Sequence, residues 1–126
     1  MERKLKILLV DDDQSSHLTV SAFLKRNFDP EVLAAFSVQE ALIHLNTESV
    51  DCIVSDFDMP GGNGYKLARS VLDSDQHIPF IFYTGSNVHP LMLEYKGSSF
   101  PIIQKPLYRQ LAVAVKIQLA QNKLLH

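Results

Sequence analysis

Five short apolar runs, rich in branched side chains, recur along the chain and alternate with stretches that have the spacing of amphipathic helices. The runs are residues 5–10 (LKILLV), 32–36 (VLAAF), 51–55 (DCIVS), 78–83 (IPFIFY) and 101–104 (PIIQ). Strands that alternate with helices are joined by right-handed crossovers, which place helices on both faces of a parallel sheet. The sequence therefore predicts an α/β fold, doubly wound around a five-stranded parallel sheet.

The stretches between and after these runs carry apolar stripes that predict helices. The first helix follows Asp13, with Ser15 or Ser16 near its start as candidate caps, and Ser37 with Glu40 has the pattern of a capping box ahead of the second. The stripes expected to face the core are Leu18, Ala22 or Val20, and Leu24 in the first helix; Ala41, Leu42 and Leu45 in the second; Tyr65, Leu67, Ala68, Val71 and Leu72 in the third; and Leu111, Val115, Ile117 or Gln118, and Leu119 in the last, at about residues 107–124.

A further, weaker helix is expected at about residues 91–96, between the fourth and fifth runs. Pro90 obscures its start and Gly97 obscures its end, because both residue types interrupt helices. We therefore expect this fourth helix to be short or irregular.

Length and charge fit one domain spanning residues 1–126. A chain of 14.2 kDa buries well over half of its unfolded surface around a single core. The net charge of −2 and the pI near 6.2 give no general attraction to nucleic acid or to anionic membranes. We expect no direct contact with nucleic acid and no membrane insertion, since the apolar patch at residues 5–10 is too short to span a bilayer.

Cys52 is the only cysteine and lies inside an apolar run. An internal disulfide is therefore impossible, and a small, buried, reduced thiol is expected. This state suits the cytoplasm, which is where we expect the protein to act.

Charged and hydroxyl side chains follow four of the apolar runs directly. The first run ends in Asp11, Asp12 and Asp13, the third in Asp56, the fourth in Thr84 and the fifth in Lys105. The carboxyl ends of parallel strands share one edge of the sheet, and ligands bind there where the strand order reverses. We therefore expect these side chains to lie close together.

The expected cluster holds more negative charge than its one lysine offsets. Like charges roughly 4 Å apart repel by about 4 kcal/mol at an effective dielectric constant of about 20, so Asp11, Asp12 and Asp56, with Asp58 nearby, require protons or a bound cation. Ligands that are all oxygens suit Mg²⁺ or Mn²⁺ and disfavour zinc. A divalent ion beside a lysine and Thr84 predicts phosphoryl transfer, with Asp56 as the nucleophile and an acyl phosphate as the product.

Four segments, ILLVDDD, CIVSDFDMPGGNGYKL, FIFYTGS and IIQKPL, resemble the motifs of the receiver domain of two-component response regulators, in the usual order and over nearly the whole chain. The resemblance implies a flavodoxin-like (βα)5 fold with strand order 2-1-3-4-5. It also implies a site, namely a phospho-acceptor at Asp56, Mg²⁺ held by Asp11, Asp12, Asp56 and the backbone carbonyl of Asp58, a switch hydroxyl on Thr84 and a phosphate-binding amine on Lys105. Gly64 matches the family glycine before the third helix, and the Lys105-Pro106 bond is often cis in the family.

The resemblance further implies a role in signalling. Receivers take a phosphoryl group from a histidine kinase or a histidine phosphotransfer domain and act on a downstream effector protein or domain. We therefore expect a signalling switch that is no enzyme in the usual sense, since it catalyses only its own aspartyl phosphorylation and dephosphorylation.

One departure from the family pattern concerns the aromatic residue three positions before the conserved lysine. Ile102 occupies that position here, and the nearest aromatic is Phe100, followed by Pro101. Either Phe100 or Ile102 is a candidate for the switch role that the family gives to this ring.

Some of the polar residues are expected to have structural roles and no part in phosphoryl transfer. Asp13 is expected to cap the first helix, because a carboxylate is favourable at a helix amino terminus. The histidines are expected on the surface, since none pairs with another at ligand spacing; they are His17, His44, His77, His89 and His126.

Three rival functions remain open on the sequence alone. Asp56 and Asp58 have the spacing of the nucleophile and the general acid/base in haloacid-dehalogenase-type phosphatases, although Met-Pro follows them here. A flavodoxin-like protein that binds FMN is a second rival, but its phosphate would meet three acids after the first strand. The third is a degenerate receiver that serves only as a docking module.

Overall fold

A five-stranded parallel sheet forms the centre of the protein. The structure, a computed structural model, describes residues 4–60, 63–89 and 93–121. The strands are β1 (Lys6–Val10), β2 (Glu31–Ala35), β3 (Cys52–Ser55), β4 (Phe80–Thr84) and β5 (Ile102–Gln104). They pair in parallel in the order β2-β1-β3-β4-β5, so the predicted topology is confirmed.

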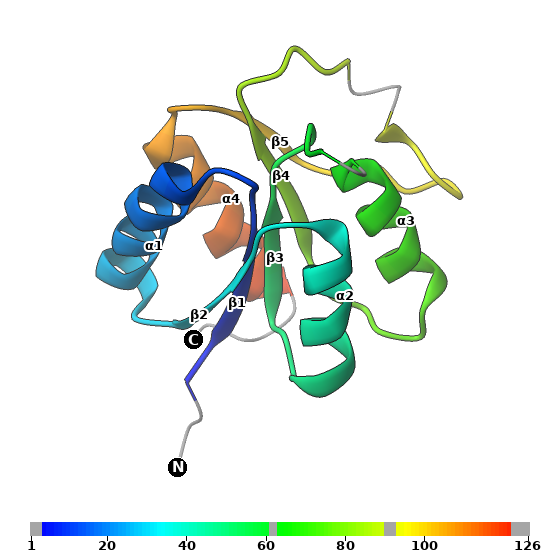
Figure 1. Cartoon of the computed structure of the whole chain (residues 1–126), viewed down its shortest axis with the longest axis horizontal. Coiled ribbons are helices and arrows are strands. Elements are labelled where there is room, and N and C mark those ends of the chain that lie inside the picture. Colours follow the sequence, from blue (N-terminus) through cyan, green and yellow to red (C-terminus); the bar gives the residue numbers. More distant parts are fainter. Residues whose placement is uncertain (1–3, 61–62, 90–92, 122–126) are drawn as a thin grey trace.

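Helices cover both faces of the sheet (Figure 1). The described α-helices are α1 (Gln14–Phe28), α2 (Val38–Thr47), α3 (Gly64–Asp73) and α4 (Tyr108–Gln121). Helices α1 and α4 pack on one face, while α2 and α3 pack on the other. The predicted last helix is confirmed over its described part, and residues 122–124 of that prediction lie outside the described residues.

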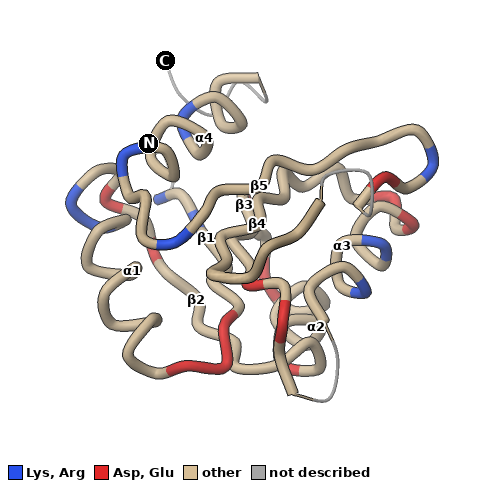
Figure 2. Tube along the Cα trace, turned by 90° about the horizontal axis from the view of Figure 1, so that it is seen from above, with Lys and Arg blue, Asp and Glu red and all other residues tan. Residues whose placement is uncertain are grey.

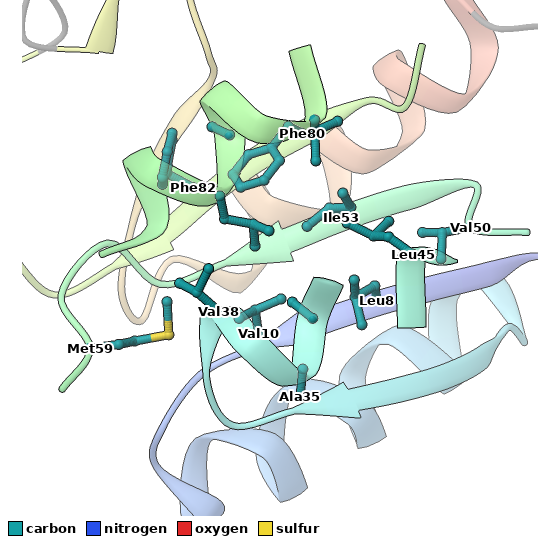
Figure 3. Close-up of a cluster of buried hydrophobic side chains, with 14 of the residues drawn as sticks. Leu8, Val10, Ala35, Val38, Leu45, Val50, Ile53, Met59, Phe80 and Phe82 are labelled. Carbon is teal, nitrogen blue, oxygen red and sulfur yellow. The ribbon is translucent and has the colours of Figure 1, made fainter. Parts of the chain in front are cut away.

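The sheet separates two apolar cores, because successive side chains of a strand point to opposite faces. In β1, Leu8 and Val10 belong to the core beneath α2 and α3, part of which Figure 3 shows, whereas Ile7 and Leu9 belong to the core beneath α1 and α4. Both faces of the strand are therefore buried. This explains why the sequence of the strand is continuously apolar instead of alternating.

Helix α1 differs from its prediction at the cap and in its buried face. Asp13 is the N-cap and its carboxylate accepts the Ser15 N–H, so the expectation of a serine cap is wrong and the capping role of Asp13 is confirmed. Leu18 is 68% exposed, and the buried face is formed by His17, Val20 and Leu24. The prediction that Leu18 faces the core is therefore wrong, whereas Val20 and Leu24 are buried as predicted.

The other helices agree closely with their patterns. The Ser37 hydroxyl accepts the Glu40 N–H at 3.1 Å, which confirms that side of the capping box. The apolar stripe predicted for α2 is buried at Ala41 and Leu45, whereas Leu42 is 36% exposed. The stripe predicted for α3 is buried at Leu67, Ala68 and Val71. In α4 the buried positions are Leu111, Val115 and Leu119, and Ile117 is 48% exposed.

The connection between β4 and β5 contains the expected irregular segment. Residues 90–92 lie outside the described part, and the described residues 93–96 do not form the predicted helix. Instead, Leu93 occupies a 3₁₀ turn, and Tyr95 and Ser98 exchange two backbone hydrogen bonds of 2.9 Å. The expectation of a short or irregular element is correct for the described residues, and a helix through residue 96 is wrong.

Two further findings bear on the expected environment. Cys52 is a free, fully buried thiol, as the sequence predicted. Among the described residues, no helix is long and apolar enough to cross a membrane.

Candidate functional site

The carboxyl ends of β1, β3, β4 and β5 bring the predicted polar residues together. Val10 pairs with Ser55 in the sheet, so Asp11 and Asp56, the next residues, lie side by side. The Asp56 N–H donates to the Val10 carbonyl at 2.8 Å. In Figure 2, the red segment between β1 and α1 is the acidic run at residues 11–13. The strand register itself therefore builds the cluster.

Three carboxylates form a group that suits a cation. One oxygen from each of Asp11, Asp12 and Asp56 lies within 4.8 Å of the others. Asp11 is buried, Asp56 is partly buried and Asp12 is exposed, so the group opens toward solvent on one side. The donors are all carboxylate oxygens, which is the chemistry that Mg²⁺ and Mn²⁺ prefer.

Lys105 supplies a positive charge at the inner side of this group. Its Nζ lies 2.7 Å from Asp11 Oδ2, 3.5 Å from Asp56 Oδ2 and 3.2 Å from Ser16 Oγ. Burial opposes the charged form of the amine, but the hydrogen bond to Asp11 and the charge of Asp56 outweigh it, so the pKa of Lys105 is raised above its ordinary 10.5. Lys105 therefore stays protonated at neutral pH.

The two oxygens of the Asp56 carboxylate have different surroundings. Oδ1 accepts the N–H of Phe57 at 2.7 Å, and Oδ2 faces the Lys105 amine at 3.5 Å. The side chain is 15% exposed. Asp56 is thus held in one orientation while it keeps access to solvent.

Thr84 ends the neighbouring strand and is fully buried. Its Oγ1 accepts the Ser86 N–H at 3.1 Å, and the Lys105 N–H donates to the Thr84 carbonyl at 2.9 Å. Oγ1 acts as an acceptor toward Ser86, and within the described part of the chain its hydroxyl donates to no acceptor. Thr84 and Lys105 are therefore joined through the backbone of adjacent strands.

The Asp58 carboxylate does not join the acidic group. It accepts a hydrogen bond from the Ser86 hydroxyl, and the Ser86 carbonyl accepts the side-chain N–H of Gln104 at 3.1 Å. Ser86 thus connects the loop after β3 with β4 and β5. The predicted role of the Asp58 backbone carbonyl stays a prediction.

Sequence reasoning missed three residues at or below the site. Ser16 was considered only as a helix cap, Ser86 was not considered, and His17 was expected on the surface although it is 5% exposed. The other described histidines, at positions 44, 77 and 89, are partly or fully exposed, and His126 lies outside the described residues. Spacing offered a signal for His17, because it precedes the buried Val20 and Leu24 by three and seven positions.

Comparison with known proteins gives one consistent family. The family model of the response regulator receiver domain matches residues 7–115. This chain belongs to that family. The receiver domain is 33% identical over 105 residues to the two-component response regulator ORR13 of Oryza sativa subsp. japonica, covering 80% of this chain and 86% of the rice protein.

Further relatives differ greatly in length. The receiver domain is 35% identical over 85 residues to the CAI-1 autoinducer sensor kinase/phosphatase CqsS of Vibrio cholerae, covering 65% of this chain but only 12% of that protein. A response regulator receiver domain protein of Clostridium thermocellum superposes with a TM-score of 0.83 at 27% identity, covering 97% of this chain and 99% of the other. These matches favour neither a haloacid-dehalogenase-type phosphatase nor an FMN-binding flavodoxin.

Proposed function

We propose that this receiver domain is a signalling switch in which Asp56 accepts a phosphoryl group from a phosphohistidine on a histidine kinase or phosphotransfer domain. The observation that carries the proposal is the placement of a partly exposed Asp56 carboxylate beside Asp11, Asp12 and Lys105, with Thr84 buried at the end of the next strand. Membership of the receiver family supports the same conclusion.

The chemistry follows from the two different oxygens of Asp56. Oδ2 attacks phosphorus, the bond from phosphorus to the donor's imidazole nitrogen breaks, and the imidazole leaves with that electron pair and takes up a proton. The Phe57 N–H holds Oδ1, and the Lys105 amine offsets charge on the phosphoryl oxygens. The Thr84 hydroxyl, at the end of β4, would donate to one of these oxygens.

A divalent cation is part of the proposal. Asp11, Asp12, Asp56 and the Asp58 carbonyl would hold Mg²⁺, or Mn²⁺ in its place. When bound, the ion neutralises charge that develops on the transferring group. Lys105 alone offsets only part of the charge of three carboxylates, so the group has a physical need for such an ion.

Output is proposed to be a shift between two conformations, biased by the phosphoryl group, that changes affinity for an effector protein or domain. Phe100 is the better placed of the two candidates for a switch ring, because its ring packs edge-on against Phe80 and Phe82 with centroids 5.8 Å apart. Ile102 has no ring with which to make such a contact.

We also propose that residues 1–126 act as one receiver domain in the cytoplasm, which the buried, unpaired Cys52 supports.

The proposal is tested by incubating the chain with Mg²⁺ and acetyl phosphate, or with a phosphorylated histidine kinase, and measuring the intact mass. We expect one added phosphoryl group in the wild type, none in Asp56→Asn, and wild-type labelling in Asp75→Asn, which changes an exposed aspartate away from the site. Persistent labelling of Asp56→Asn would contradict the assignment. A wild type that stays unmodified by both donors would favour a docking module, and sustained turnover of a phosphate monoester would favour a phosphatase.

A further inference from the structure

His17 lies directly beneath the acidic group, and the residue is 5% exposed. Nε2 lies 2.6 Å from the Asp11 carbonyl oxygen and 3.0 Å from the Ala35 carbonyl oxygen. A carbonyl oxygen only accepts hydrogen bonds, so Nε2 must carry the hydrogen and donate to both. One ring nitrogen therefore joins α1 to the ends of β1 and β2.

The rest of the ring has no second polar anchor. Nδ1 is buried and has no hydrogen-bond partner among the described residues. The Phe36 ring lies against the imidazole, with 4.2 Å between the centroids. The orientation of the imidazole is therefore set by two carbonyl oxygens and one aromatic contact.

These contacts hold the backbone of Asp11 at both of its polar groups. The Ala35 carbonyl, which accepts from His17, also accepts the Asp11 N–H at 3.0 Å. The Asp11 carbonyl belongs to the planar peptide that leads into Asp12. Fixing this carbonyl consequently fixes the direction in which the chain enters Asp12.

The two adjacent carboxylates differ in how much else holds them. The Asp11 carboxylate accepts the Asp13 N–H at 3.0 Å and the Lys105 amine at 2.7 Å. The exposed Asp12 carboxylate makes no hydrogen bond or ion pair within the described part of the chain, although one of its oxygens lies within the 4.8 Å group. The placement of Asp12 thus depends on its backbone, which His17 holds.

We propose that His17 is a positioning residue that sets the affinity of the acidic group for a divalent cation by orienting the peptide between Asp11 and Asp12. This inference rests on the metal site of the proposed function. Groups that orient metal ligands without touching the metal typically change affinity by about 10- to 100-fold when they are lost. His17 acts here through a backbone carbonyl instead of a ligand side chain, so we expect the lower end of that range.

The first test compares Mg²⁺ affinity among variants of the full chain, with no phosphodonor present. The dissociation constant is obtained by following the backbone amide resonances of residues 11–13 in ¹⁵N-labelled protein as Mg²⁺ is added. We expect His17→Leu, which has no donor, to bind Mg²⁺ about tenfold more weakly. His17→Gln, whose side-chain amide has an N–H near the place of Nε2, should restore most of the affinity.

Val20→Ala is the matched control for a merely structural effect. Val20 is 2% exposed and lies on the same buried face of α1 as His17, but it has no polar group with which to hold the backbone of Asp11. We expect this variant to unfold at lower temperature while it keeps wild-type Mg²⁺ affinity. A loss of affinity in Val20→Ala equal to that in His17→Leu would overturn the positioning role.

A second test needs no variant and no metal. The imidazole ¹⁵N spectrum of His17 in the wild type should show a hydrogen on Nε2, and an Nε2 that carries no hydrogen would overturn the proposal. Equal Mg²⁺ affinity in wild type and His17→Leu would overturn this inference alone. Absence of any Mg²⁺ response at residues 11–13 of the wild type would instead contradict the metal site itself, and the positioning role with it.

Discussion

Gly64, the first residue of α3, lies directly against the backbone of Asp56. A methyl group added at Gly64 would stand 2.2 Å from the Asp56 carbonyl oxygen and 3.0 Å from the nearest carbon of the Phe82 ring. The Gly64 N–H also donates to the Phe57 carbonyl at 2.7 Å. The start of α3 is thus packed so closely on the loop that presents Asp56 that only glycine fits.

We therefore predict that Gly64→Ala lowers the free energy of unfolding by about 1–3 kcal/mol, the usual cost of overpacking, and slows labelling by acetyl phosphate because Asp56 is displaced. Urea denaturation and intact mass measure the two effects. Gly85→Ala is the control for stability, since among the described residues no atom outside Gly85 and its two chain neighbours lies within 4 Å of its added methyl group. It should stay within about 0.5 kcal/mol of the wild type, and equal stability of the two variants would contradict the prediction.

Removing the Lys105 amine should destabilise the protein at neutral pH. The Asp11 side chain is 4% exposed and loses its 2.7 Å partner in Lys105→Met. We expect a loss of about 1–3 kcal/mol in urea denaturation, because a buried acceptor is left unsatisfied. Asp11→Asn in the same background should recover part of this loss, since it removes the unpaired charge. A Lys105→Met variant as stable as the wild type would show that the pair contributes no net stability.

The topology and the acidic group could be predicted because they depend on patterns that sequence displays directly. Apolar runs gave the strands, and residues that immediately follow a strand, such as Asp11, Asp56 and Lys105, share one edge in any parallel sheet. The family resemblance supplied the strand order, which apolar patterning does not contain. The structure then confirmed that order.

The features that sequence reasoning missed depend on contacts across the fold. His17 is buried because two carbonyls, at Asp11 and Ala35, accept its Nε2–H, and neither is visible in a one-dimensional pattern. Ser86 lies two residues beyond Thr84, where only the assembled loops bring it to the Asp58 carboxylate. In α1 the alternatives Ser15 and Asp13 are both good caps, so propensity could not choose between them.

Burial of Cys52 predicts a specific response to alkaline pH. Burial, followed by the charge of Asp51, raises the pKa of the Cys52 thiol from 9.0 to about 12. The unfolded chain therefore ionises first, and the stability due to the neutral thiol is complete below pH 9 and is lost as the pH rises toward the folded pKa. Above pH 9 the unfolding free energy of the wild type should fall by up to about 1.4 kcal/mol per pH unit more than that of Cys52→Ala.

Denaturation curves collected at several alkaline pH values measure this difference in slope. The cavity left by Cys52→Ala lowers stability at every pH and so does not affect the comparison. Parallel slopes for the two proteins would contradict the prediction, as would rapid reaction of the folded wild type with a thiol reagent at neutral pH.

Asp73 should report how the segment before β5 is held against α3. Its carboxylate accepts the Lys96 amine at 2.6 Å and the Tyr95 hydroxyl at 2.9 and 3.0 Å. The Lys96 hydrogen bond first, and the Tyr95 hydrogen bond second, lower the pKa of Asp73 below its ordinary 3.8. The contact therefore contributes stability above pH 3.8 and loses it as the pH falls through the folded pKa.

We predict that Lys96→Gln raises the pKa of Asp73 toward 3.8 more than Tyr95→Phe does, because the lysine is the larger cause of the shift. Carboxyl ¹³C shifts give the pKa. Amide exchange at Tyr95 and Ser98, whose backbone groups bond to each other, should become faster in both variants because the segment loses its attachment to α3. Asp75→Asn is the control and should leave both measurements unchanged. An Asp73 pKa that is unaltered in Lys96→Gln would show that the amine does not hold this carboxylate in solution.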